Sequence, residues 1–283
     1  MRSVRFRPPR SKSRWFGPWL ERELLLTLDI GNTNITFGVF DETGGAPDYA
    51  PRATWRIATD RDRLADEYGL LLSNLLSVKG ITTGMVEAAT LCSVVPPLTP
   101  AFVELCGDYF GVEPMVVGAG VKTGIKVMYD NPRDVGSDRI ADAVAALKLY
   151  GGPVIIVDFG TATVFDAVSA DFEYIGGAIA PGLSVAADAL FHNTSQLRRV
   201  ELLRPSTAIG RNTVHAMQSG LVLGYSEMVR GMVARFDREM GGGCKVLATG
   251  GLAGLIASET NIFDAVVPNL TLAGLRIIHE LNT

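Results

Sequence analysis

Two stretches of this chain share one pattern, and that pattern constrains the fold more than any other feature. Each runs from an apolar segment through an aspartate, one apolar residue, a glycine and a small polar turn into a second apolar segment. The copies cover residues 24–41 and 154–168. The apolar segments are too short to cross a membrane, and the turn between them predicts a β-hairpin. Two such hairpins in successive halves indicate a duplicated unit whose tips face one shared cleft.

The tip of the first hairpin, at Asp29 and residues 32–34, has a composition that suits anion binding. Small residues let backbone N–H groups approach an anion, and Asn and Thr add neutral donors. Because phosphate repels a carboxylate, Asp29 is expected to act through Mg²⁺ or a metal-bound water. For one copy alone, an ordinary hairpin whose aspartate caps the turn is the alternative. Neither copy continues as a Walker loop or as a G-x-G-x-x-G helix start.

Composition sets the class of protein. With 283 residues, of which 47% are hydrophobic and 20% charged, the chain can form two ordinary domains and is not disordered. The net charge of −4 argues against general nucleic-acid binding, and no stretch is long enough to span a membrane. The chain has three cysteines without C-x-x-C spacing and only three histidines, which argues against a zinc site and fits reduced thiols in the cytoplasm.

The N-terminal segment differs in composition from the rest. Residues 1–14 carry arginines and a lysine but no acidic residue, and they lack the apolar core of a secretory signal. A basic arm that binds an acidic partner is one interpretation. We expect instead that residues 1–23 are a disordered extension, followed by an N-terminal domain over 24–150 and a C-terminal domain over 151–283.

A polar, turn-rich stretch over residues 129–139 lies between the hairpins, within an alternation of strands and helices that predicts an α/β fold. Apolar residues at helical spacing follow it, so Ser137 fits an N-cap and places Asp138 and Arg139 in the first turn. Asp138 either only complements the helix dipole or acts as a general base, with Arg139 binding an anionic group of the substrate.

Three further segments carry weaker signals. Residues 176–182 form a glycine-rich bend after a strand, and residues 210–213 precede a long helix predicted over about 214–236. In that helix, the small residues 220–224 are suited to packing against another helix or a second subunit. Residues 249–251, Thr-Gly-Gly, end a strand before another helix and could seat the sugar or phosphate of a nucleotide.

Taken together, the motifs at Asp29, Asp158 and Thr249 resemble the two phosphate motifs and the adenosine motif of the actin, sugar-kinase and Hsp70-like ATPase superfamily. Within it, the chain is most similar to the type III pantothenate kinase family, on residues 129, 136–139, 176–182 and 210–213. The resemblance implies two duplicated ribonuclease H-like (actin-like ATPase) α/β domains with a cleft between them. It also implies ATP-dependent phosphorylation of pantothenate, the first step of coenzyme A biosynthesis.

The resemblance assigns roles by position. Asp138 would be the proton acceptor for the pantothenate hydroxyl, and Asp158 would bind K⁺ or NH₄⁺. Asp29 would organise Mg²⁺, through water. The ATP contacts it implies are Asp29, Ile30, Gly31, Asn32, Thr33, Asn34, Ile35, Thr36 and Thr161. The substrate contacts it implies are Tyr129, Gly136, Ser137, Asp138, Arg139 and Thr213, the last across a homodimer.

Two alternatives stay open at this point. A non-catalytic accessory regulator of transcription shares the scaffold, although it would have no need for the complete set of aspartates. A kinase for another small hydroxy acid, or a general actin-like ATPase, is the second alternative, because a fold does not fix function.

Overall fold

The structure is a computed structural model that describes residues 23–41 and 49–283. Apart from Glu23, the basic segment over residues 1–23 lies outside the described residues. No helix in the part of the chain that the structure describes is both long and apolar enough to cross a membrane.

Within the described residues, five strands form the first sheet in the order β3-β2-β1-β4-β5. They are β1 (Leu24–Ile30), β2 (Asn34–Asp41), β3 (Ala53–Ala58), β4 (Val86–Ser93) and β5 (Met115–Val116). The first hairpin predicted from sequence is β1 and β2, which pair antiparallel, while β1 pairs parallel with β4. The side chains of the central strand β1 are almost all buried, as its continuous apolar run predicts.

The second sheet, again counted over the described residues, has six strands in the order β11-β10-β7-β8-β9-β6. They are β6 (Lys126–Val127), β7 (Val154–Phe159), β8 (Ala162–Val168), β9 (Glu173–Pro181), β10 (Lys245–Thr249) and β11 (Ala265–Val266). The second predicted hairpin is β7 and β8, and β7 pairs parallel with β10. The arrangement around β7 repeats that around β1, which confirms the duplicated α/β unit.

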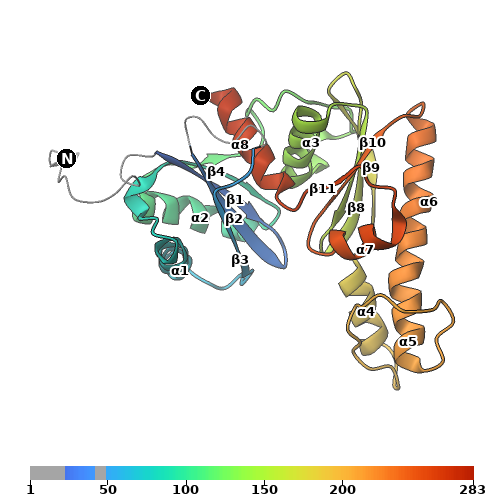
Figure 1. The fold of residues 1–283 in the computed structure, drawn as a ribbon. Coiled ribbons are helices and arrows are strands. Elements are labelled where there is room, and N and C mark those ends of the chain that lie inside the picture. The colour runs from blue at the N-terminus through green and yellow to red at the C-terminus, as the bar shows by residue number, and fades with distance from the viewer. Residues whose placement is uncertain (1–22, 42–48) are drawn as a thin grey trace, which may run out of the picture.

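Two helices, α3 (Ser137–Tyr150) and α8 (Leu270–Asn282), pack against each other between the sheets (Figure 1). Helix α8 also contacts β1, β2 and β4, and α3 contacts β7 and β8 of the second sheet and β4 of the first. The two backbones come so close that a Cβ on Gly274 would collide with the carbonyl group of Ala141. The core around these helices joins the two halves, since it includes Leu25 of β1 and Ile156 of β7.

The remaining helices cover the outer faces. They are α1 (Ala65–Val78), α2 (Thr99–Leu105), α4 (Leu183–His192), α5 (Thr213–Gln218), α6 (Gly224–Glu239) and α7 (Ala253–Thr260). Helices α1 and α2 share a core with the first sheet, and α6 and α7 share one with the second. Figure 1 shows α4 and α5 extending beyond the second sheet; we call residues 183–218 the α4–α5 arm.

The structure corrects one local prediction. Ser137 is not the N-cap of α3: Gly136 holds that position, and Ser137 is the first helical residue. The Ser137 hydroxyl instead accepts a 3.3 Å hydrogen bond from the backbone N–H of Ser93 on β4. The long helix expected over about 214–236 is confirmed as one continuous helical run, made of α5, a π-helical turn at Ser219–Leu223 and α6.

The domain boundary expected between residues 150 and 151 stays a prediction. Elements from both sides of it are interleaved, since β6 pairs with β9 and α8 lies on the first sheet.

Candidate functional site

The tips of the two hairpins touch. The hydroxyl oxygens of Thr33 and Thr161 lie 2.7 Å apart, although the residues are 128 positions apart in the chain. The first tip is fastened to the segment after β3, because the Thr59 hydroxyl donates to the Gly31 carbonyl at 2.6 Å. The backbone N–H of Thr59 also donates to the Thr33 carbonyl at 3.0 Å. Residues 32–34 are exposed, so a ligand can reach the tip.

Behind the tips, carboxylates from three elements lie close enough to repel one another. Burial, and then the charges of Asp138 and Asp158, raise the pKa of Asp29 to about 7. Burial, and then the charge of Asp138, raise the pKa of Asp158 to about 7. The pKa of Asp138 itself is raised by burial, despite the 2.8 Å hydrogen bond that its Oδ1 accepts from the backbone N–H of Arg139. Asp29 is the penultimate residue of β1, Asp158 is the penultimate residue of β7, and Asp138 is the second residue of α3.

A fourth carboxylate, Asp142, belongs to the same group and was missed in the sequence. It lies one turn after Asp138 on α3, is buried, and accepts a 2.7 Å hydrogen bond from the Thr271 hydroxyl. Burial and the charge of Asp158 raise its pKa well above the usual range. Its four-residue spacing from Asp138, on the helix face otherwise filled by Ala and Val, was a signal that could have found it.

The thiol of Cys92 also points at this group, with its Sγ 3.4 Å from Oδ1 of Asp29. The strand register explains the contact, because Cys92 of β4 is the direct partner of Asp29 on β1. Burial raises the pKa of the thiol well above its ordinary value, so it is a neutral donor to the carboxylate. Cys92 is a buried, free cysteine.

Arg139 is held by a carboxylate that sequence reasoning also missed. Its Nε and Nη2 lie 3.0 and 2.6 Å from Oδ1 of Asp166, which the Tyr174 hydroxyl also contacts at 2.6 Å. The ring of Tyr129 lies 6.2 Å from that of Tyr174, so Tyr129 joins the same cluster. A Cβ on Gly177 would collide with the backbone carbonyl of Phe165 and would also lie 2.7 Å from Nη2 of Arg139, which explains a glycine there. The sequence signal was a single aspartate, Asp166, within the apolar strand β8.

Two glycines are needed beside the aspartates. A Cβ on Gly136 would collide with Oδ1 of Asp138, and a Cβ on Gly250 would collide with Oδ1 of Asp158. Gly250 has a φ of +89°, a conformation that L residues rarely adopt. The Thr-Gly-Gly segment at the end of β10 therefore lies directly against the second hairpin.

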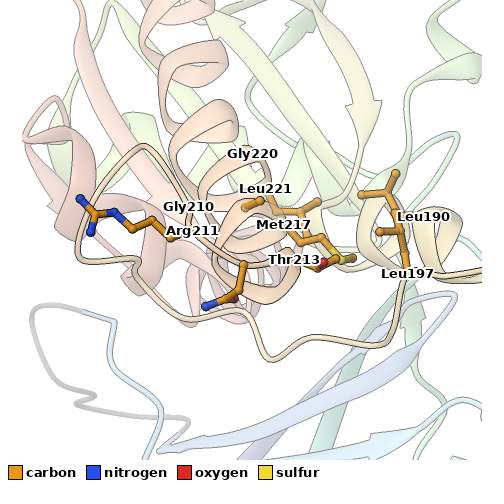
Figure 2. Close-up of a pocket in the computed structure, with 10 residues that line it drawn as sticks. Leu190, Leu197, Gly210, Arg211, Thr213, Met217, Gly220 and Leu221 are labelled. Atoms are coloured by element: carbon orange, nitrogen blue, oxygen red, sulfur yellow. The ribbon is translucent and has the colours of Figure 1, made fainter.

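Thr213 lies elsewhere. It begins α5 in the α4–α5 arm and lines a pocket of about 630 Å³. Figure 2 shows the apolar side chains of Leu190, Leu197 and Met217 in this pocket, with the side chain of Arg211 directed away from them. No described contact links Thr213 to the aspartates of the same chain.

The aspartates behind the hairpin tips are suited to Mg²⁺ and a monovalent cation because their negative charges repel one another. Among these residues, no group of three or more His, Cys, Asp or Glu side chains is arranged to enclose a metal ion. Mg²⁺ in kinases is held by one or two carboxylates, water and the substrate phosphates, so it does not require such a group. The raised pKa values of Asp29 and Asp158 show that a cation beside them would remove repulsion.

Comparison with solved structures gives the class of fold. A ROK hexokinase from Thermus thermophilus has a TM-score of 0.50 and 13% identity, covering 90% of this chain and 98% of that one. The ethanolamine utilization protein EutJ from Carboxydothermus hydrogenoformans has a TM-score of 0.53 and 13% identity, covering 92% and 91%. The fold is thus that of the actin-like ATPases and sugar kinases.

The family follows from sequence relatives. The family model described as type III pantothenate kinase matches residues 25–235. Proteins named type III pantothenate kinase from Roseiflexus sp. (strain RS-1) and Moorella thermoacetica are 52% and 50% identical to this chain. Each match covers 92% of this chain and 99% or 100% of the relative. This chain belongs to the type III pantothenate kinase family.

Membership decides between the alternatives left open by the sequence. The close relatives are named as pantothenate kinases, and neither a transcriptional regulator nor a kinase of another hydroxy acid is needed to explain the match.

Proposed function

We propose that the aspartates behind the two hairpin tips, together with Arg139, carry out the reaction of this family. As a type III pantothenate kinase, the chain phosphorylates pantothenate with ATP, the first step of coenzyme A biosynthesis. The observation that carries the assignment of residues is the contact between Thr33 and Thr161, 2.7 Å, beside the buried carboxylates. It unites in space two phosphate motifs that lie far apart in sequence.

Asp138 is the proton acceptor. The pantothenate hydroxyl oxygen attacks the γ-phosphorus, the bond to the β-phosphate bridging oxygen breaks, ADP leaves, and the hydroxyl proton passes to Asp138. Phosphoryl transfer depends mainly on positioning and charge neutralisation, so a weak base that accepts the proton late is sufficient. Burial raises the pKa of Asp138, which makes it a stronger base than an exposed aspartate.

Arg139 and Tyr129 hold the substrate, with Gly136 and Ser137 shaping the start of α3. Asp166 accepts hydrogen bonds from Nε and Nη2 of Arg139, and these bonds fix the plane of the guanidinium. A guanidinium held this way can offer its remaining donors to the carboxylate of pantothenate. Because Arg139 directly follows Asp138, one helix start aligns the substrate and accepts its proton.

The residues from Asp29 to Thr36, with Thr161, bind the ATP phosphates. The exposed residues 32–34 supply neutral donors, and Asp29 organises Mg²⁺ through water. Asp158 holds K⁺ or NH₄⁺ next to them, where the close approach of Gly250 leaves no space for a side chain. Bound cations supply positive charge that balances the phosphates.

Thr213 contacts pantothenate across a homodimer. The α4–α5 arm supports this arrangement because it exposes apolar side chains, including those of Leu190, Ile209 and Val214. Its pocket of about 630 Å³ lies beside Thr213. We place the enzyme in the cytoplasm, where its free cysteines would stay reduced.

The cation assignment is tested by measuring phosphopantothenate formation in K⁺, NH₄⁺ or Na⁺. We expect turnover in K⁺ or NH₄⁺ but not in Na⁺, and its loss in Asp158→Asn. The exposed Asp171→Asn is the matched control and should behave as the parent. Equal turnover in Na⁺ would contradict the monovalent site, and a folded, ATP-binding protein without any turnover would contradict the reaction.

The dimer assignment is tested by mixing two inactive variants, Asp138→Asn and Thr213→Val, at a pantothenate concentration below KM. If Thr213 completes the site of the partner, each mixed dimer contains one intact site, and about a quarter of the parent activity returns. No recovery on mixing, or a monomer by light scattering, would contradict the shared site.

A further inference from the structure

Arg56 of β3 lies on the face of the first sheet that carries Asp29. Asp29 is the register partner of Thr36, and Thr36 is the register partner of Arg56, so the three side chains form one row across β1, β2 and β3. Directly opposed residues in antiparallel strands point to the same face. The neighbours Trp55 and Ile57 pack into the outer core, which confirms that Arg56 points to the other side.

The guanidinium of Arg56 reaches across to the second half of the molecule. A Cβ placed on Gly251 would lie 3.2 Å from Nη1 of Arg56. Gly251 follows Gly250, which itself lies against Asp158 of the second hairpin. Figure 1 shows the first hairpin reaching toward the second sheet, so an arginine two strands away can meet the end of β10. Arg56 therefore lies between the first phosphate motif and the Thr-Gly-Gly segment.

Among the described residues, Arg56 differs from other arginines near the site because its side chain has no hydrogen-bond or ion-pair partner. Arg139 is bound to Asp166, and Arg61 donates to the Asn32 side chain at 2.9 Å. Among the residues that the structure describes, no hydrogen bond, ion pair or aromatic contact involves Arg56, and its side chain is exposed. The guanidinium of Arg56 thus lies beside the segment of Gly250 and Gly251 without a carboxylate partner. In this position it can bind an anion that is not part of the chain.

We propose that Arg56 binds a phosphate group of the nucleotide, from the N-terminal half, while the nucleotide lies on Gly250 and Gly251. The proposal rests on the nucleotide position given under Proposed function. The site holds Asp29, Asp138, Asp142 and Asp158, so an entering polyphosphate meets unfavourable charge that a free guanidinium would offset. The fork of an arginine suits two phosphate oxygens at once, which a lysine cannot match.

The test compares Arg56→Ala and Arg56→Lys with the parent in direct binding of Mg·ATP, Mg·ADP and adenosine by calorimetry. For Arg56→Ala we expect Mg·ATP and Mg·ADP to bind about 10-fold or more weakly, since a charge-assisted bond is lost. Adenosine binding should stay unchanged, and Arg56→Lys should fall between the two. In steady-state assays KM for ATP should rise with KM for pantothenate unchanged.

The matched control is Arg235→Ala, which removes another exposed arginine, on α6. Unchanged Mg·ADP affinity in Arg56→Ala would overturn the proposal, as would an equal loss for adenosine, which would indicate a structural role. If the alanine variant unfolds, Arg56→Gln repeats the comparison with a neutral side chain of similar length. Binding is measured without pantothenate, so failure of the kinase reaction in the parent would be seen separately.

Discussion

At the scale of single residues, the site is defined by carboxyl groups whose pKa values are raised by burial and by the negative charge of their neighbours. Sequence motifs identified Asp29 and Asp158 because turn residues follow each of them, and Asp138 because a turn-rich stretch precedes it. Asp142 and Asp166 have no such motif around them, and each lies between apolar residues, in α3 and β8 respectively. Their partners, Thr271 and Tyr174, come from other elements, so only the fold could reveal the pairs.

The buried carboxylates predict that the free protein loses stability as pH rises. Their folded pKa values lie above 3.8, so the folded state binds more protons than the unfolded state between about pH 4 and those values. Stability is therefore fully present at low pH and declines through about pH 7, where Asp29 and Asp158 ionise. The pKa of Asp142 is also raised well above its usual range, by burial and then by the charge of Asp158, so this residue contributes to the same decline.

Asp142→Asn should flatten this decline while keeping an oxygen for the Thr271 hydroxyl. At pH 8 we expect its Tm to exceed that of the parent by about 2–4 °C for each kcal/mol of repulsion removed. Thermal melts from pH 5 to 8 measure it, with Asp171→Asn as the exposed control. If the Tm of the variant fell with pH as steeply as that of the parent, ionisation of Asp142 would not be destabilising the folded protein.

Tyr174→Phe tests whether Asp166 acts by orienting Arg139. The change removes one donor to Asp166 and keeps the ring, so we expect KM for pantothenate to rise about 3- to 10-fold with kcat little changed. Tyr109→Phe, which removes a hydroxyl bonded to Asp66 far from the site, is the matched control. A fall in kcat without a change in KM would argue against a positioning role.

At the scale of elements, apolar runs and helical spacing predicted the two hairpins and the helix after residue 139, while the ends and contacts of the elements required the structure. The hairpin sequences predicted β1–β2 and β7–β8 because local turn chemistry sets a hairpin. The prediction of Ser137 as the N-cap of α3 was wrong. Its hydroxyl instead accepts a hydrogen bond from the backbone N–H of Ser93 on β4, and this partner is too distant in sequence to be predicted. The crossing of α3 and α8 at Gly274 is likewise a long-range contact.

Gly274→Ala should weaken this crossing. The added methyl group would meet the rigid backbone carbonyl of Ala141, and such overpacking costs about 1–3 kcal/mol. Gly254→Ala on α7 is the control, because its Cβ would meet nothing within 4 Å and a helical alanine is favoured over glycine by about 0.5–1 kcal/mol. Urea unfolding should move the two midpoints in opposite directions; equal midpoints would contradict the packing of α3 on α8.

At the scale of the whole molecule, the two repeated halves place one phosphate motif each on either side of the Thr33–Thr161 contact. Helices α3 and α8 lie between the sheets, so the helix that carries Asp138 is packed on both halves at once. The repeat made this arrangement predictable from sequence. The α4–α5 arm was not predictable, because nothing in its sequence shows where it extends.

The central claim is that Asp138 at the start of α3 accepts the proton of pantothenate, and Asp138→Asn tests it most directly. The variant keeps an oxygen for the Arg139 N–H but is a far weaker base, so kcat should fall by about 10²–10⁴-fold. The Kd for Mg·ATP, measured on the same preparation, should not increase. Unchanged turnover in the folded variant would contradict Asp138 as the base and leave the reaction itself standing.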